Sequence, residues 1–134
     1  MDPQATILLV EDDPTIAALM HDALTDEGYR VLVAVSPTVG CTILMAFRVG
    51  LILTDDFRGD DPWAPLAPLV TQAGSTPVIL CSAANPALYA NYVDHGFAGL
   101  LPEPFDLDAL VLLVAEKLPP RSVRRNVQDT LHHC

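Results

Sequence analysis

The sequence predicts an α/β fold in which helices pack on both faces of one parallel sheet, and three observations lead to this prediction. Short apolar runs with strand character alternate along the chain with stretches of helical periodicity. Two of these runs, 7–10 and 51–54, contain only apolar or β-branched residues, which is typical of strands buried on both faces. Both runs end directly in acidic residues, at the point where an open parallel sheet places its ligand site.

The first half of the chain predicts three strands and two helices. Asp13-Pro14 is typical of a helix start, because aspartate caps the first turn and proline fits the first helical position. Gly28 marks the end of that helix, and a valine-rich run follows it. The predicted elements are strand 7–10, a helix from 14 to Gly28, strand 30–35, a helix from 37 or 38 to 47, and strand 51–54.

The second half predicts two further strands and three helices. Prolines crowd the segment 60–68, so the third helix is expected only from about 65 to 73. Asn85-Pro86 indicates the start of a fourth helix and Gly96 its end. The predicted elements are helix 65–73, strand 77–81, helix 86–94, strand 98–101 and a helix that opens at 105–106 and runs to 117.

Five βα units in succession predict a flavodoxin-like (βα)5 three-layer sandwich with a parallel sheet in the strand order 2-1-3-4-5. Each crossover must return over the sheet with the same hand, which limits the topology to this kind. The first and third strands are then neighbours. Glu11 and Asp12 would lie beside Asp55 and form an oxygen-rich pocket suited to a hard divalent cation.

With 134 residues, the chain is long enough for one well-buried domain and too short for two ordinary ones. We expect this domain to span residues 1–118. Beyond it, 119–134 would form a short basic tail with three arginines against one aspartate. The apolar residues at 123, 127 and 131 of this tail fit either a short amphipathic helix or a frayed terminus.

Composition excludes several classes of partner. A formal net charge of −10 argues against nucleic acid or an anionic membrane surface as the main partner.

The N-terminus lacks the pattern of a targeting segment, and no apolar run reaches membrane-spanning length. Three cysteines, an odd number, favour reduced thiols over a disulfide framework. These features together predict a cytoplasmic protein.

Four motifs follow one another at the ends of the predicted strands. They are Val-Glu-Asp-Asp-Pro at 10–14, Leu-Ile-Leu-Thr-Asp at 51–55, Pro-Val-Ile-Leu-Cys-Ser-Ala at 77–83 and Leu-Pro-x-Pro-Phe-Asp at 101–106. In this order they resemble the receiver domain of two-component response regulators, and the resemblance covers residues 5–118.

The resemblance implies a role for each acidic position. Asp55 corresponds to the phosphoacceptor, and Glu11 and Asp12 to the acidic pair that holds Mg²⁺ together with Asp55 and the backbone carbonyl of Phe57. Ser82 corresponds to the hydroxyl that donates to a phosphoryl oxygen. The chemistry is consistent with this, since a carboxylate that attacks a phosphoryl group needs a cation to neutralise the oxygens.

The largest departure from the family is Glu103, which stands between two prolines where the family has a lysine. An ionised Glu103 should disfavour a phosphorylated Asp55, although crowding by other carboxyls would raise its pKa. Lys117 is the only lysine in the chain and lies near the end of the last predicted helix. Arg58 is the only nearby cation that the sequence offers as a substitute.

Two further departures concern signal transmission. Leu100 replaces an aromatic residue that turns inward on activation in the family, so the usual coupling from Ser82 to the neighbouring face is in doubt. Gly59 replaces a proline that commonly follows the acceptor, which loosens the loop.

These features predict a single-domain response regulator that takes a phosphoryl group from a histidine kinase or histidine phosphotransfer protein onto Asp55. It would signal through contacts with a downstream protein target. It would not be an enzyme beyond self-catalysed phosphorylation and dephosphorylation. An alternative is a pseudo-receiver that acts as an interaction module without phosphorylation. A haloacid-dehalogenase-like phosphatase is a third possibility, but such enzymes carry an acid where Phe57 stands.

Overall fold

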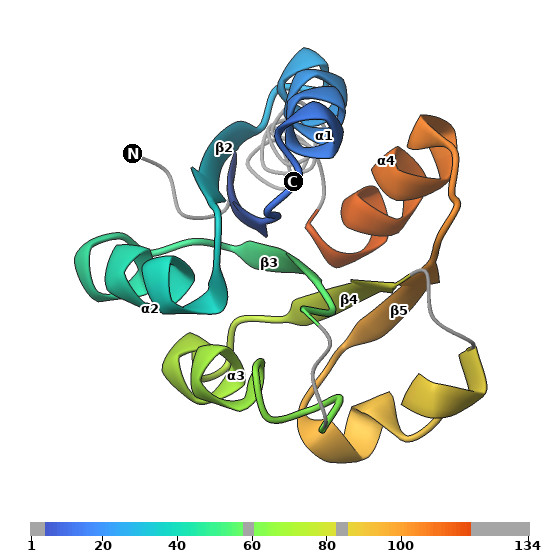
Figure 1. The fold of residues 1–134 in the computed structure, drawn as a ribbon. Coiled ribbons are helices and arrows are strands. Elements are labelled where there is room, and N and C mark those ends of the chain that lie inside the picture. The colour runs from blue at the N-terminus through green and yellow to red at the C-terminus, as the bar shows by residue number, and fades with distance from the viewer. Residues whose placement is uncertain (1–4, 58–60, 83–85, 119–134) are drawn as a thin grey trace, which may run out of the picture.

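A computed structural model describes residues 5–57, 61–82 and 86–118, and its centre is a five-stranded sheet (Figure 1). The strands are β1 (Thr6–Val10), β2 (Arg30–Ala34), β3 (Leu51–Asp55), β4 (Val78–Ser82) and β5 (Gly99–Pro102). All neighbouring pairs are parallel, and the order across the sheet is β2-β1-β3-β4-β5. The predicted flavodoxin-like topology is therefore confirmed.

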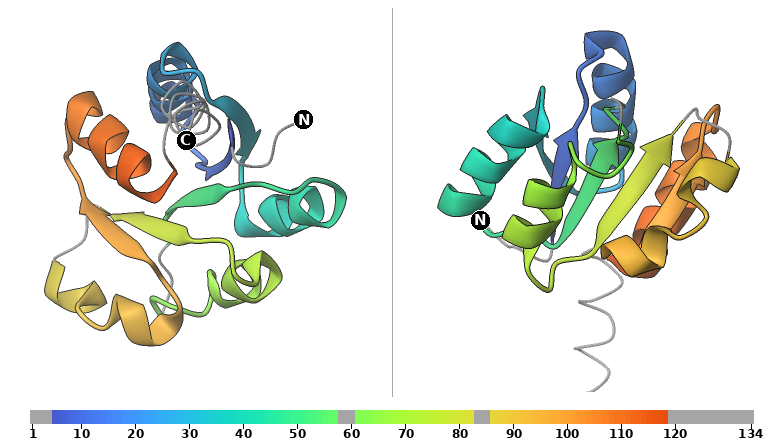
Figure 2. Two further views of the ribbon diagram at one scale, coloured as in Figure 1. Left: turned by 180° about the vertical axis from the view of Figure 1, so that it is seen from behind. Right: turned by 60° about the horizontal axis from the view of Figure 1, so that its bottom comes forward.

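Four α-helices cover the two faces of the sheet. They are α1 (Pro14–Asp26), α2 (Pro37–Ala46), α3 (Ala67–Ala73) and α4 (Leu107–Lys117). Figure 2 shows α1 and α4 on one face and α2 and α3 on the other. None of these helices, nor any other in the described ranges, is long and apolar enough to cross a membrane.

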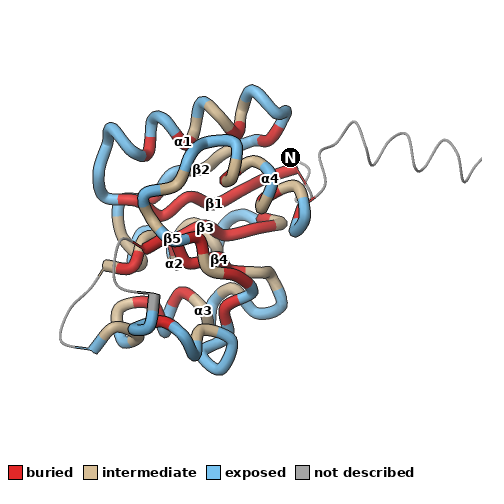
Figure 3. The backbone as a smooth tube through the Cα atoms, turned by 90° about the vertical axis from the view of Figure 1, so that its right-hand side faces the viewer, coloured by how far each residue is buried: buried red, intermediate tan, exposed pale blue. Residues whose placement is uncertain are grey.

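The core has two halves because successive strand residues point to opposite faces of the sheet. Alternate residues of β1, Ile7 and Leu9, pack with apolar residues of α1 and α4 such as Leu24 and Leu110. The intervening Leu8 and Val10 pack in the other half, with residues that include Leu69 of α3. Figure 3 shows that β1 and most of β3 are buried along their length, as their uninterrupted apolar sequences predict.

Side-chain caps fix where three of the helices begin. Asp13 accepts hydrogen bonds from the N–H groups of Thr15 and Ile16 at the start of α1. Ser36 accepts from the third residue of α2, and Asp106 accepts from the Ala109 N–H at the start of α4. Each cap satisfies a backbone donor that has no partner within its helix. The caps therefore set where α1, α2 and α4 leave the carboxyl edge of the sheet.

The helix predicted for 86–94 is wrong, because two short 3₁₀ segments take its place. These are η2 (Pro86–Tyr89) and η3 (Tyr92–His95), and their turns close through i to i+3 bonds such as Asp94 N–H to Asn91 C=O at 3.1 Å. Aromatic, β-branched and Asn/Asp residues lower the helix propensity of 89–95. The predicted start at Asn85 lies outside the described residues, as do Arg58, Gly59 and the tail 119–134.

Aromatic packing holds the two 3₁₀ segments against the sheet. The Trp63 ring lies 5.1 Å from that of Tyr89 in an edge-on arrangement and stacks on His95 at 4.0 Å. Tyr89 and Phe97 are both buried in the α2 and α3 half of the core. The free energy gained by burying these large rings thus offsets the loss of the α-helical hydrogen bonds that this segment does not form.

Candidate functional site

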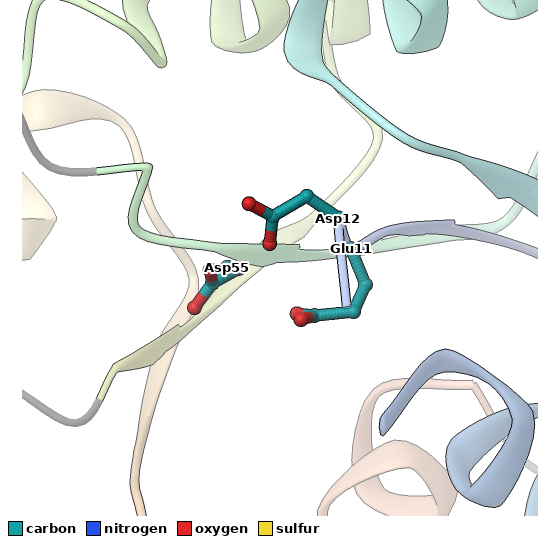
Figure 4. Close-up of side chains that lie close together, drawn as sticks. All are labelled: Glu11, Asp12 and Asp55. Atoms are coloured by element: carbon teal, nitrogen blue, oxygen red, sulfur yellow. The ribbon is translucent and has the colours of Figure 1, made fainter. Parts of the chain in front are cut away.

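Three carboxylates meet at the carboxyl ends of β1 and β3 (Figure 4). Glu11 and Asp12 directly follow β1, and Asp55 is the last residue of β3. Because Val10 pairs with Thr54 in the parallel ladder, the acids that follow lie side by side. One oxygen from each of the three carboxylates lies within 4.8 Å of the others. The structure therefore brings together the acidic residues that the sequence singles out.

The backbone around Glu11 is fixed by local hydrogen bonds. Its N–H donates to the C=O of Ala34 at 2.9 Å, which extends the β1–β2 ladder by one bond. Its Oε1 accepts from the Asp13 N–H at 3.2 Å. Glu11 is buried, Asp55 is half-buried and Asp12 is exposed. The cluster thus has a buried carboxyl group on one side and an exposed one toward solvent.

Burial and mutual repulsion raise the pKa values of two carboxyl groups at the site. Burial, followed by the charge of Asp55, raises the pKa of Glu11 to about 7, against a smaller opposing effect of its bond from the Asp13 N–H. Burial and the charges of Asp55 and Asp56 raise the pKa of Glu103 as well. An oxygen-binding cation would relieve this repulsion.

Glu103 reaches the acidic cluster from β5. It follows Pro102, the last residue of β5, and its N–H donates to the C=O of Ser82 at 2.6 Å. Its side chain is half-buried at one end of a cavity of about 420 Å³ between α1 and the segment 103–107. The structure therefore holds Glu103 through its backbone at the end of β4, next to the acidic cluster.

The Ser82 hydroxyl makes a contact that the sequence analysis does not foresee. Its Oγ donates to Oδ2 of Asp56 at 2.7 Å, and both residues are buried. Asp56 has no role in the site that the sequence predicts. The contact follows from the register between β3 and β4, which the sequence does not specify: Asp55 pairs with Cys81, so the residues that follow, Asp56 and Ser82, also lie side by side.

The remaining predicted positions lie around this cluster. Phe57 follows the acids with a left-handed backbone, φ 46°, and its side chain packs in the α2 and α3 half of the core. Leu100 is half-buried against the same half. The carboxylate oxygens of the cluster are of the kind that Mg²⁺ takes as ligands, since it commonly binds through one or two carboxylates with several waters retained.

Comparison with known proteins gives one consistent family. The model of the response regulator receiver domain matches residues 7–115. The DNA-binding transcriptional regulator NtrC of Rhizobium meliloti strain 1021 is 30% identical over 116 residues, which are 85% of this chain and 24% of that protein. The chain therefore spans about a quarter of the length of this curated relative.

Solved structures give the same fold. NtrX from Brucella abortus has a TM-score of 0.76 and 25% identity, with coverage of 94% of this chain and 30% of that one. The receiver domain of the sensor histidine kinase PA1611 from Pseudomonas aeruginosa PAO1 has a TM-score of 0.73 and 20% identity, with coverage of 85% and 97%. The crystal structure of that receiver domain has a magnesium ion coordinated in its active-site cleft.

Proposed function

The chain belongs to the response regulator receiver domain family, and from that premise we propose that it acts in two-component signalling as a magnesium-dependent phosphoacceptor. We propose residues 1–118 as the receiver domain and 119–134 as a basic tail. The phosphoryl donor would be a histidine kinase or a histidine phosphotransfer protein, and the output would pass to a downstream protein through surface contacts.

One observation carries this proposal: the oxygens of Glu11, Asp12 and Asp55 lie within 4.8 Å of one another at the edge of the sheet. In the proposed reaction an Asp55 carboxylate oxygen attacks the phosphorus atom of a phosphohistidine. A P–O bond to Asp55 forms as the P–N bond breaks, and the imidazole leaves with the electron pair. Bound Mg²⁺ would neutralise the charge on the phosphoryl oxygens.

The proposed ligands have separate tasks. Glu11 is the fixed, buried ligand, because both its backbone and its carboxyl are held by hydrogen bonds. Asp12 is exposed and would complete the acidic pair, with the Phe57 carbonyl as a backbone ligand. Ser82 would donate to a phosphoryl oxygen once its hydroxyl is released from Asp56.

Glu103 favours a second candidate function, the pseudo-receiver that works as an interaction module. Its carboxyl lies near enough to Asp55 and Asp56 for their charges to raise its pKa, so it would repel a phosphoryl group on Asp55. Such a protein would keep the fold and the cation site without stable phosphorylation.

The test is a titration with Mg²⁺ and then with beryllofluoride, a mimic of the acyl phosphate. Calorimetry would measure binding, and Trp63 fluorescence would report any change near η2 and η3, at constant pH because His95 stacks on that ring. We expect saturable beryllofluoride binding that requires Mg²⁺ and is lost in Asp55→Asn. Binding of Mg²⁺ alone, with beryllofluoride binding gained only in Glu103→Lys, would favour the pseudo-receiver.

A further inference from the structure

The hydrogen bond from Ser82 to Asp56 engages the hydroxyl that, in the proposed function, would donate to a phosphoryl oxygen on Asp55. The Oγ to Oδ2 distance is 2.7 Å, and the two side chains are only 2% and 8% exposed. Hydrogen bonds with a charged acceptor are stronger than neutral ones, and burial shields this one from water. The hydroxyl is therefore firmly held in the form that the structure shows.

The backbone places these two side chains together. Asp55 pairs with Cys81, whose side chain belongs to the α1 and α4 half of the core. The next residues, Asp56 and Ser82, also lie side by side, and their side chains meet in this hydrogen bond. Ser82 is also fixed through its backbone, since its C=O accepts from the Glu103 N–H at 2.6 Å. Ser82 thus links the ends of β3, β4 and β5.

We propose that Asp56 is a positioning residue that competes with the phosphoryl group for the hydroxyl proton of Ser82. A serine hydroxyl has one proton to donate, so it serves Asp56 or a phosphoryl oxygen on Asp55, but not both. This inference rests on the proposed function of Asp55. Its consequence is that the native site binds a phosphoryl group more weakly than its serine would otherwise allow.

Asp56 and Glu103 oppose phosphorylation by different physical routes. Glu103 acts through its charge, which any neutral substitution removes. Asp56 acts through its charge and also through the hydrogen bond that it accepts from Ser82. Only the second effect depends on the presence of the serine hydroxyl, and a double-mutant cycle isolates such a dependence.

The test compares four proteins: the native chain, Asp56→Leu, Ser82→Ala and the double variant. Leucine has the same branching and the same number of side-chain heavy atoms as aspartate, but it is larger and accepts no hydrogen bond. Beryllofluoride affinity at saturating Mg²⁺ is measured by calorimetry. We expect Asp56→Leu to tighten binding about tenfold when Ser82 is present, the equivalent of one hydrogen bond with a charged partner, and distinctly less when combined with Ser82→Ala. Equal tightening in both backgrounds would reduce Asp56 to a charge effect and overturn the proposal.

Two controls keep the outcome interpretable. Asp56→Asn removes the charge and keeps an acceptor oxygen, so we expect it to tighten binding less than Asp56→Leu. Mg²⁺ affinity and thermal unfolding of each variant check that the site and the fold are intact. If Mg²⁺ binds but no variant binds beryllofluoride, both the phosphoacceptor function and this inference fail.

A single variant tests the proposal even if Asp56→Leu does not fold. Because Asp56 already holds the hydroxyl in the native chain, Ser82→Ala alone should weaken beryllofluoride binding by no more than about twofold. A loss of about tenfold or more in Ser82→Ala would mean that the serine donates to the phosphoryl mimic despite Asp56, and it would overturn the inference while leaving the proposed function in place.

Discussion

Glu103 opposes a second negative charge on Asp55. Burial raises its pKa, and the charges of Asp55 and Asp56 raise it further, because both carboxylates repel a negative charge on Glu103. Two unit charges at about 5 Å repel by roughly 3 kcal/mol when the effective dielectric constant is about 20. Partial exposure of Glu103 and salt will reduce this figure. We therefore expect Glu103 to influence both the cation affinity and the anion affinity of the proposed site.

Glu103→Lys should change these two affinities in opposite directions. We expect weaker Mg²⁺ binding, because the side chain next to the proposed cation site changes from negative to positive. We expect beryllofluoride binding at saturating Mg²⁺ to be tighter by about tenfold or more. Glu103→Gln, which changes the charge by one unit only, is the matched control and should fall between the two proteins. Calorimetry measures both affinities. A parallel change of both would contradict the electrostatic explanation.

The raised pKa of Glu11 predicts how stability depends on pH without metal. The folded protein keeps this proton up to a pKa of about 7, whereas an unfolded chain loses it near 4.5. The folded form binds more protons between these values, so the stabilising contribution is complete below 4.5 and is lost as the pH rises through 7. The melting temperature in chelator should fall across this range, and Glu11→Gln should flatten the fall.

Magnesium should reverse this dependence. Metal ligation requires the ionised carboxylate, so Mg²⁺ should raise the melting temperature more at about pH 8 than at about pH 6. The same scans with and without Mg²⁺ measure the effect. An equal rise at both pH values would show that the Glu11 proton is not displaced by the metal.

Among the elements, the segment from η2 to Gly96 depends on a close approach to α3. Gly96 has a φ of +89°, and a Cβ built on it would lie 2.7 Å from Cγ1 of Val70. Gly96→Ala should therefore cost both backbone strain and a steric clash, about 2–4 kcal/mol of unfolding free energy in total. Gly28→Ala is a matched control, because Gly28 has a φ of +94° with nothing within 4 Å of its Cβ position. Chemical denaturation of both variants should show the larger loss for Gly96→Ala.

The elements also show how far sequence reasoning reaches. Each predicted strand agrees with the observed one to within one residue at either end, because an apolar run closed by acids or turn residues defines both its type and its limits. The α-helix expected at 86–94 does not form, because the packing of aromatic rings around Trp63, which is distant in sequence, decides the backbone conformation there. The third helix begins at Ala67, later than the expected 65.

The same limit applies to the site. The meeting of Glu11, Asp12 and Asp55 follows from strand order, which the alternation of elements predicts. The bond from Ser82 to Asp56 depends on the register between β3 and β4, which the sequence does not specify. Tertiary contacts such as this one decide which group the Ser82 hydroxyl binds. The local sequence pattern indicates only that Ser82 lies near the end of a strand.

For the molecule as a whole, one hydrogen bond joins the start of β2 to the end of the described C-terminal helix. The buried Tyr29 donates through its hydroxyl to the C=O of Leu118, which follows α4. Tyr29→Phe should lower the unfolding free energy by about 1–2 kcal/mol, because a buried carbonyl loses its donor. Tyr92→Phe, at a half-buried tyrosine on the other face of the sheet, is the matched control. Equal melting temperatures for the native chain and Tyr29→Phe would contradict this role.

The rate at which Cys81 is alkylated can report how often the fold opens around this residue. Its side chain is buried beneath Asp55 and Glu103, and burial and these charges raise the pKa of its thiol, so the thiolate that alkylating reagents require does not form in the closed protein. Alkylation of Cys81 therefore requires a transient opening of the fold that exposes this side chain. In a variant with Cys41 and Cys134 replaced by serine, the rate at which iodoacetamide labels Cys81 would measure how often the centre of the sheet is exposed.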